Sequence, residues 1–140
     1  MKKNRAFTLI ELMVVILILA ILAALVVPNV LGKTGAAKVA KAKADLAVLR
    51  DSIDNFRLDC DRYPTTQEGF DALRNAPSGI NGWRGPYLSK DLGKDPWGHD
   101  YIYQTPGPSG KDGYIVESYG QDGAPGGEGD NEDITDGADN

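Results

Sequence analysis

Residues 7–27 read FTLIELMVVILILAILAALVV, and this stretch decides how the chain is organised. Thr8 and Glu11 are its only polar positions, and the short segment Met1–Arg5 before it is basic. About 20 apolar residues in a helix cross the hydrocarbon core of a bilayer, so the stretch predicts a transmembrane helix. The basic flank favours a cytoplasmic N-terminus. A cleaved signal peptide is the alternative, but its apolar core is shorter, and here Val27-Pro28-Asn29 ends the apolar run in place of an Ala-x-Ala site.

The composition of the 140 residues excludes several classes of protein. Fifteen Lys and Arg against 20 Asp and Glu give a formal net charge of -5, which does not suit a nucleic-acid-binding surface. Cys60 is the one cysteine, so an internal disulfide is impossible, and with His99 as the one histidine a His- or Cys-rich zinc site is excluded. No acid–base pair or cleft-forming motif stands out, and we therefore expect no enzyme activity.

Glu11 is the unusual residue of the apolar stretch. A charge deep in a bilayer costs about 2.5–3.5 kcal/mol on insertion scales, which marks Glu11 as a functional residue that needs a partner. The alternative, which assigns Glu11 no special function, is that Glu11 lies at the membrane surface and stays hydrated. The segment Arg5-Ala6-Phe7-Thr8-Leu9-Ile10-Glu11-Leu12 resembles the processing site of type IV pilins and pseudopilins.

That resemblance implies that a prepilin peptidase cuts between Ala6 and Phe7 and that the new N-terminal Phe7 is N-methylated. The family usually has Gly before the cut, and Ala6 is the smallest alternative. The resemblance also implies that the Glu11 carboxylate pairs with the free amine of Phe7 in the neighbouring subunit. Such a pair relieves two costly buried charges at once, so we expect packed copies rather than isolated ones.

Beyond Pro28 the pattern becomes amphipathic. Proline in a helix interior removes a hydrogen bond, so we expect a bend or a locally melted segment over Pro28–Gly35. Apolar residues then follow alternating spacings of three and four, which predicts a helix that buries one stripe on its own domain and ends near Asp61. The stripe consists of Val39, Ala42, Leu46, Leu49, Ile53, Phe56 and Cys60.

The residues after this helix predict a small mixed domain. Thr65 and Glu68 have the spacing of a helix capping box, which predicts a short helix to about Asn75. Tyr101–Gln104 and Tyr114–Tyr119 have the composition of strands and are joined by a Gly- and Pro-rich connection. The predicted fold class is α+β, with a long N-terminal helix packed on a small antiparallel β-sheet.

Three motifs of this domain resemble the major pseudopilins of type II secretion systems, which belong to the type IV pilin-like superfamily. They are Tyr63-Pro64-Thr65-Thr66, Asp95-Pro96-Trp97-Gly98 and Tyr119-Gly120-Gln121-Asp122-Gly123. The resemblance implies a pilin-like fold in three parts. These are a cleaved leader over residues 1–6, a transmembrane, filament-core helix over 7–31, and a periplasmic globular domain over 32–140.

The acidic tail, residues 120–140, has two interpretations. It holds six of the 17 glycines and no Lys or Arg, and this composition alone is typical of a disordered segment. Glycines interleaved with carboxylates also suit calcium, although the spacing is not that of an EF-hand. We expect Thr135–Asn140 to be loose, because the ending usual in the pseudopilins is absent beyond Ile134.

The resemblance implies one structural calcium ion in this tail. Its implied ligands are the side chains of Asp122, Asp130 and Asp133 and the backbone carbonyl of Tyr119. Such a site couples the binding of the ion to the folding of the tail onto the sheet.

The same resemblance implies a structural subunit that polymerises into the periplasmic pseudopilus of a type II secretion system and drives export of folded proteins across the outer membrane. It implies a single-pass location in the inner membrane, with the C-terminal domain in the periplasm. The implied partners are further copies in a helical filament, the minor pseudopilins, the inner-membrane assembly platform and the prepilin peptidase. Two alternatives remain open: a subunit of a type IV pilus-like filament, and a monomeric, membrane-anchored binding domain.

Overall fold

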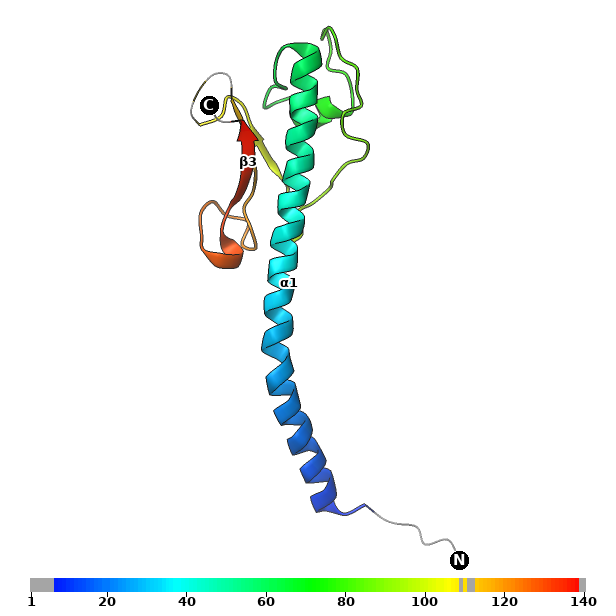
Figure 1. Ribbon diagram of the computed structural model, residues 1–140, viewed down its shortest axis with the longest axis vertical. Coiled ribbons are helices and arrows are strands. Elements are labelled where there is room, and N and C mark those ends of the chain that lie inside the picture. The colour runs from blue at the N-terminus through cyan, green and yellow to red at the C-terminus, as the bar shows by residue number, and fades with distance from the viewer. Residues whose placement is uncertain (1–6, 109, 111–112, 139–140) are drawn as a thin grey trace, which may run out of the picture. The chain divides into compact units, whose positions relative to one another are not determined.

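The structure is a computed structural model that describes residues 7–108, 110 and 113–138, and the side chains of residues 24–33 lie outside this description. The chain forms two compact units, Met1–Ala36 and Ala37–Asn140. One long helix, α1 (Leu9–Cys60), contributes to both units (Figure 1). The boundaries of the three predicted parts stay predictions, and the first of these parts lies outside the described residues.

In the first unit, α1 begins directly after Thr8. The Thr8 hydroxyl accepts a hydrogen bond from the backbone N–H of Glu11 at 3.2 Å, and the Thr8 carbonyl accepts one from the N–H of Leu12 at 3.3 Å. Thr8 is therefore the N-cap of the helix. The apolar side chains described in this unit are exposed, with Leu9 at 78% and Val15 at 45%.

In the part of the chain that the structure describes, there is no helix whose length and apolar character suffice for crossing a membrane. The predicted transmembrane span over residues 7–31 is not tested by this finding. The side chains of that span are described only as far as Ala23. The described apolar run is thus shorter than the about 20 residues that a bilayer requires, and the span stays a prediction.

The locally melted segment expected over Pro28–Gly35 is wrong, because α1 includes these residues and continues to Cys60. The alternative of a bend there stays a prediction. A proline removes only one backbone hydrogen bond from a helix. The segment 36–47 that follows is rich in Ala and Lys, which are strong helix formers. The rest of the helix therefore outweighs the cost of one proline.

The predicted apolar stripe of α1 is confirmed in the second unit. Its central members are buried in the core, and Val39 and Cys60 pack partly buried against that core. The helix ends as predicted: Asp61 has φ 55°, a left-handed conformation that often terminates helices, and its N–H donates to the carbonyl of Arg57 at 2.9 Å.

The predicted capping box is also confirmed. The Thr65 hydroxyl accepts from the N–H of Glu68 at 3.2 Å, and the Glu68 carboxylate accepts from the N–H of Thr65 at 2.8 Å. Arg62 holds the same carboxylate through two hydrogen bonds, at 2.7 and 2.8 Å. The helical segment that follows is a short 3₁₀ helix, η1 (Gly69–Leu73), and not the longer helix that we expected.

Three strands form an antiparallel sheet in the order β1 (Ile102–Gln104), β2 (Tyr114–Ser118) and β3 (Ile134–Ala138). Val116 of the central strand lies opposite Tyr103 of β1 and opposite Asp136 of β3. The strand β3, labelled in Figure 1, pairs antiparallel with β2. The α+β class, with α1 and an antiparallel sheet, is confirmed.

The strand β3 corrects the expectation that Thr135–Asn140 is loose. Residues 135–138 pair with β2, and only residues 139–140 lie outside the described part. Ile134 is buried, and the Arg50 guanidinium of α1 forms an ion pair with Asp136 at 3.1 Å. These contacts stabilise a strand whose own Asp and Gly residues do not favour β-structure.

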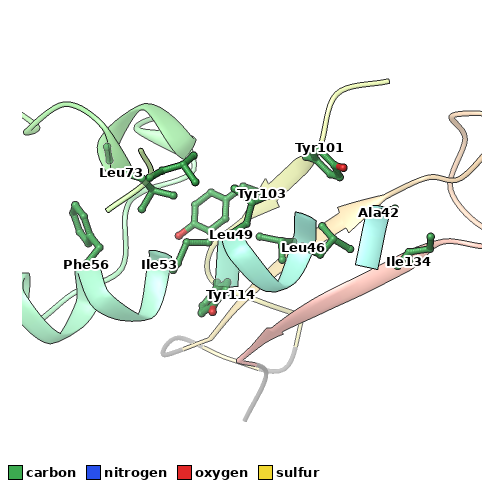
Figure 2. Close-up of a cluster of buried hydrophobic side chains, with 13 residues drawn as sticks. Ala42, Leu46, Leu49, Ile53, Phe56, Leu73, Tyr101, Tyr103, Tyr114 and Ile134 are labelled. Atoms are coloured by element: carbon green, nitrogen blue, oxygen red, sulfur yellow. The ribbon is translucent and has the colours of Figure 1, made fainter. Parts of the chain in front are cut away.

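The core of the second unit lies between α1 and the sheet. Figure 2 shows Leu46, Leu49 and Ile53 of α1 in one cluster with Tyr103 and Tyr114 from the strands. Alternate residues of β2 are buried, as expected for a strand with one face on a core.

Three tyrosines join this core to α1 by their hydroxyls. Each donates a hydrogen bond to an aspartate of the helix: Tyr101 to Asp45 at 2.7 Å, Tyr114 to Asp54 at 2.9 Å, and Tyr87 to Asp59 at 2.9 Å. Burial of the rings raises the pKa of all three, that of Tyr87 to about 12. The rings pack in or against the core while the hydroxyls find partners on α1, which fixes the helix to the rest of the second unit.

Candidate functional site

The structure describes two of the three residues predicted to act in processing and assembly, Phe7 and Glu11, whereas Ala6 lies outside the described part. Phe7 is 81% exposed. Glu11 is exposed in the first turn of α1, and no ion pair joins it to a basic side chain among the described residues. A carboxylate at this end of a helix interacts favourably with the helix dipole.

The N-cap at Thr8 was not predicted, although the sequence carried a signal for it. Thr8-Leu9-Ile10-Glu11 has the S/T-x-x-E spacing of a capping box. The observed hydrogen bond from Glu11 N–H to the Thr8 hydroxyl is one half of that motif. Glu11 therefore stands at a structurally defined position, the third residue of the helix.

A buried aspartate organises the turn between Asp95 and His99. Asp95 is 5% exposed, and its Oδ1 accepts hydrogen bonds from the N–H groups of Trp97 at 3.0 Å and His99 at 2.8 Å. Its Oδ2 accepts from the hydroxyl of Ser118 at 2.6 Å. Ser118 ends β2 and is fully buried. The turn is thus fixed to the strand from which the acidic tail departs.

The acidic tail folds back on itself. The N–H of Gln121 donates to the carbonyl of Asp130 at 2.9 Å, next to a single 3₁₀ turn, η2 (Gly129–Asn131). Gly120 has φ 63°, and a Cβ there would stand 2.9 Å from the carbonyl oxygen of Glu132 and 3.0 Å from that of Asp130. Only glycine fits this approach. The predicted ligands on either side of the tail therefore belong to one closed loop.

The structure does not gather all the predicted calcium ligands. Asp122 Oδ1 accepts from the N–H of Ala124 at 3.1 Å, and Asp133 Oδ2 accepts from the N–H of Gly126 at 2.8 Å. Asp122 and Asp130 are exposed. Among the residues that the structure describes, no group of three or more His, Cys, Asp or Glu side chains is placed to hold a metal ion.

One oxygen of the predicted set nevertheless fits a cation. Asp133 Oδ1 is buried and has no hydrogen-bond partner in the described part of the chain. A buried carboxylate oxygen without a donor costs free energy, which a bound cation would remove. Calcium takes about 6–8 oxygen ligands, and backbone carbonyls and water count among them. Asp133 beside a folded, carbonyl-rich loop therefore suits calcium, although three acidic side chains are not brought together.

Glu117 is a charged residue of this region that we did not assign from the sequence. It lies on β2 opposite Thr135 of β3. Burial and, next, the negative charge of Asp133 raise the pKa of Glu117. The available signal was the predicted strand Tyr114–Tyr119, because residues two apart in a strand, such as Glu117 and Tyr119, face the same side. A cation near Asp133 would offset the repulsion between the two carboxylates.

Comparison with known families matches nearly the whole chain. Residues 29–137 match the family model described as type II secretion system (T2SS), protein G. Residues 1–27 match the prokaryotic N-terminal methylation motif. The second match covers the predicted processing site at Ala6 and Phe7, and the first covers the tail with its predicted ligands.

Individual relatives agree with these matches. Type II secretion system core protein G of Vibrio cholerae is 45% identical over 137 residues, which cover 96% of this chain and 92% of that protein. Core protein G of Pseudomonas aeruginosa is 42% identical over 95% of this chain and 94% of that protein. Among solved structures, the major pseudopilin from the type 2 secretion system of enterohaemorrhagic Escherichia coli is 37% identical, with a TM-score of 0.60 over 79% of this chain and 95% of that chain.

Proposed function

The chain belongs to the protein G family of the type II secretion system, and from this we propose that it is a structural subunit that polymerises into a periplasmic pseudopilus. The single observation that carries the proposal is the family match over residues 29–137, with relatives matched over nearly their full length. Extension of the filament would drive folded proteins across the outer membrane. We assign the subunit no catalytic activity of its own.

The N-terminal unit supports assembly on physical grounds. Its apolar side chains are exposed in the single chain, from Phe7 to Leu22. Exposed apolar surface of this extent requires a lipid or protein environment. We assign the unit first to the inner membrane, as a single span with the C-terminal domain in the periplasm, and then to the core of a helical filament of identical copies. The minor pseudopilins, the inner-membrane assembly platform and the prepilin peptidase would be its other partners.

Processing would prepare the chain for assembly. The match to the methylation motif supports a cut between Ala6 and Phe7 and N-methylation of Phe7. The cut would release an amine that Glu11 of a neighbouring copy can pair with. Glu11 has no ion-pair partner of its own among the described residues, so the carboxylate is available for this contact.

The tail would hold one structural calcium ion. The proposed ligands are Asp133, Asp122 and Asp130 together with the carbonyl of Tyr119. The unpaired Oδ1 of Asp133 and the closure of the loop at Gly120 support this assignment. The ion would stabilise the folded tail, because it would neutralise Asp133, whose negative charge raises the pKa of the neighbouring Glu117.

The experiment that tests the function places the full-length chain in a bacterium whose type II system lacks its own protein G. Wild-type chain should restore secretion and form filaments, and mass spectrometry should find an N-methylated Phe7 at the N-terminus. Glu11→Gln, which keeps the size of the side chain but removes its charge, should abolish filaments at an unchanged amount of membrane-bound chain. Asp51→Asn, an exposed acid farther along α1, is the matched control.

Three outcomes would contradict the proposal. An intact Met1, or a start near Lys33, would exclude pilin-like processing. Filaments without restored secretion would favour the pilus-like alternative. Processed chain that stays monomeric when wild-type filaments are expected would favour the membrane-anchored binding domain.

A further inference from the structure

The one histidine of the chain connects two segments that are far apart in the sequence. His99 ends the turn that Asp95 organises: its N–H donates to Asp95 Oδ1 at 2.8 Å, and its carbonyl accepts from the N–H of Asp95 at 2.8 Å. Asp95 is in turn bonded to the buried Ser118. The backbone of His99 is therefore fixed to the core, and this fixes the position from which its side chain extends.

The imidazole of His99 reaches the first turn of the acidic tail. Its Nε2 lies 3.3 Å from the carbonyl oxygen of Gln121. A carbonyl can only accept, so Nε2 carries a proton in this contact. The ring also covers Gly123, where a Cβ would stand 2.6–2.9 Å from three imidazole atoms. Gly123 has φ 66°, so both its conformation and its lack of a side chain suit this contact.

These two contacts lie on either side of Asp122. Gln121 precedes it and Gly123 follows it, so the imidazole holds the backbone that carries this carboxylate. The hydrogen bond from Ala124 N–H to Asp122 Oδ1 holds the carboxylate itself. A side chain whose backbone is already ordered loses less conformational entropy when it binds an ion.

We propose that His99 is a positioning residue that holds the Gln121–Gly123 turn in the conformation in which the tail binds calcium. The inference rests on the calcium site of the proposed function, and it adds a residue outside the tail to that site. His99 does not touch the ion. It acts through the backbone on both sides of Asp122, as outer partners of metal ligands commonly do.

The alternative is that His99 only contributes packing, and the two interpretations differ in what they change. Loss of packing lowers the stability of the calcium-free chain and leaves the affinity of the folded chain for calcium unchanged. Loss of positioning lowers the affinity and releases the backbone of residues 121–124, with little change in calcium-free stability, because the ring is only half-buried.

The test uses the full-length chain in detergent micelles and three variants. His99→Ala removes the ring, His99→Gln keeps a side-chain N–H donor, and Gln104→Ala, at an exposed position of β1, is the control. Calcium affinity is measured by calorimetric titration with calcium chloride. The calcium-free melting temperature and the amide hydrogen exchange of residues 121–124 are measured alongside.

We expect His99→Ala to weaken calcium binding by about 10-fold, to speed exchange at residues 121–124 in the absence of calcium, and to leave the calcium-free melting temperature nearly unchanged. His99→Gln should recover most of the affinity, and Gln104→Ala should match the wild type. Equal affinities for wild type and His99→Ala would overturn the inference, as would equal losses in both His99 variants.

The failure of the calcium site itself is a separate outcome. If the wild-type chain binds no calcium, the link to the ion is overturned together with the proposed metal site. The exchange measurement then decides on its own whether His99 holds the turn, and unchanged exchange in His99→Ala would exclude that as well.

Discussion

Replacing Ser118 with alanine removes one hydroxyl from a buried polar contact of the second unit. Ser118 is fully buried, Asp95 is 5% exposed, and the hydrogen bond between them is 2.6 Å long. The substitution leaves Asp95 Oδ2 without that donor, in a place that water does not reach easily. The turn of Asp95 and the strand β2 then lose their direct connection.

The expected cost follows from this geometry. A hydrogen bond to a charged acceptor contributes about 1.5–3 kcal/mol, and the buried oxygen left behind keeps the cost near the middle of that range, at about 2 kcal/mol. For a domain of this size each kcal/mol shifts Tm by about 4–8 °C, so we expect Tm to fall by roughly 8–16 °C. The denaturant slope m should not change, because the surface exposed on unfolding stays the same.

The assay is urea unfolding of the full-length chain in detergent, followed by tryptophan fluorescence. Trp97 is a suitable reporter because its backbone N–H donates to the same aspartate at 3.0 Å. Ser89→Ala, at an exposed position, is the control and should stay within about 0.5 kcal/mol of the wild type. A loss of less than about 0.5 kcal/mol for Ser118→Ala would refute the claim that this contact holds the turn.

The remaining predictions concern three carboxylates. Asp133→Asn should abolish the rise in Tm on adding calcium without lowering the calcium-free Tm, because it removes the charge of an unpaired buried oxygen; a preserved calcium response would contradict the role of Asp133. Glu117 has a raised pKa from burial and from Asp133, so its ionisation costs stability once the pH exceeds its ordinary pKa of about 4.3. Glu117→Gln should therefore raise the calcium-free Tm at pH 7 and have little effect at pH 3.5, and equal gains at both pH values would contradict this. The pKa of Glu68 is lowered by its hydrogen bonds to Arg62 and to the N–H of Thr65, so its contribution is present above the ordinary pKa and is lost as the pH falls. Glu68→Gln should cost about 0.5–1 kcal/mol in urea unfolding at pH 7 and less at pH 3; a pH-independent cost would point to packing instead.

Local periodicity and turn chemistry predicted most of the second unit. The stripe from Ala42 to Phe56 is buried because spacings of three and four place its members on one face of a helix. The capping box at Thr65 and Glu68 was predictable because both of its hydrogen bonds join residues three apart. Such features depend only on residues close in the sequence, so they can be predicted from the sequence.

The features that the sequence did not predict depend on contacts between distant residues. The strand β3 contains Asp and Gly, and it forms because Ile134 enters the core and Asp136 meets Arg50. The helix continues through Pro28 because its other hydrogen bonds outweigh one lost bond.

The same division applies to the candidate site. The carboxylate of Asp133 was assigned as a ligand from the family resemblance, because composition alone is typical of a disordered tail. Its unpaired Oδ1 and its closeness to Glu117 could not be predicted, because they depend on the register of β2 against β3. The contact of His99 with Gln121 and Gly123 joins turns more than 20 positions apart, and no local sequence pattern predicts it.

The pairing of β3 with β2 also sets an order of events during synthesis. Arg50 and Asp136 are 86 positions apart, so their contact can form only after the ribosome has released the chain through Asp136. Until β3 pairs, β2 has an open edge, which is a template for pairing with other chains. Any delay in the docking of β3 would leave this edge exposed to mispairing with other chains, and the pairing of β3 ends that exposure.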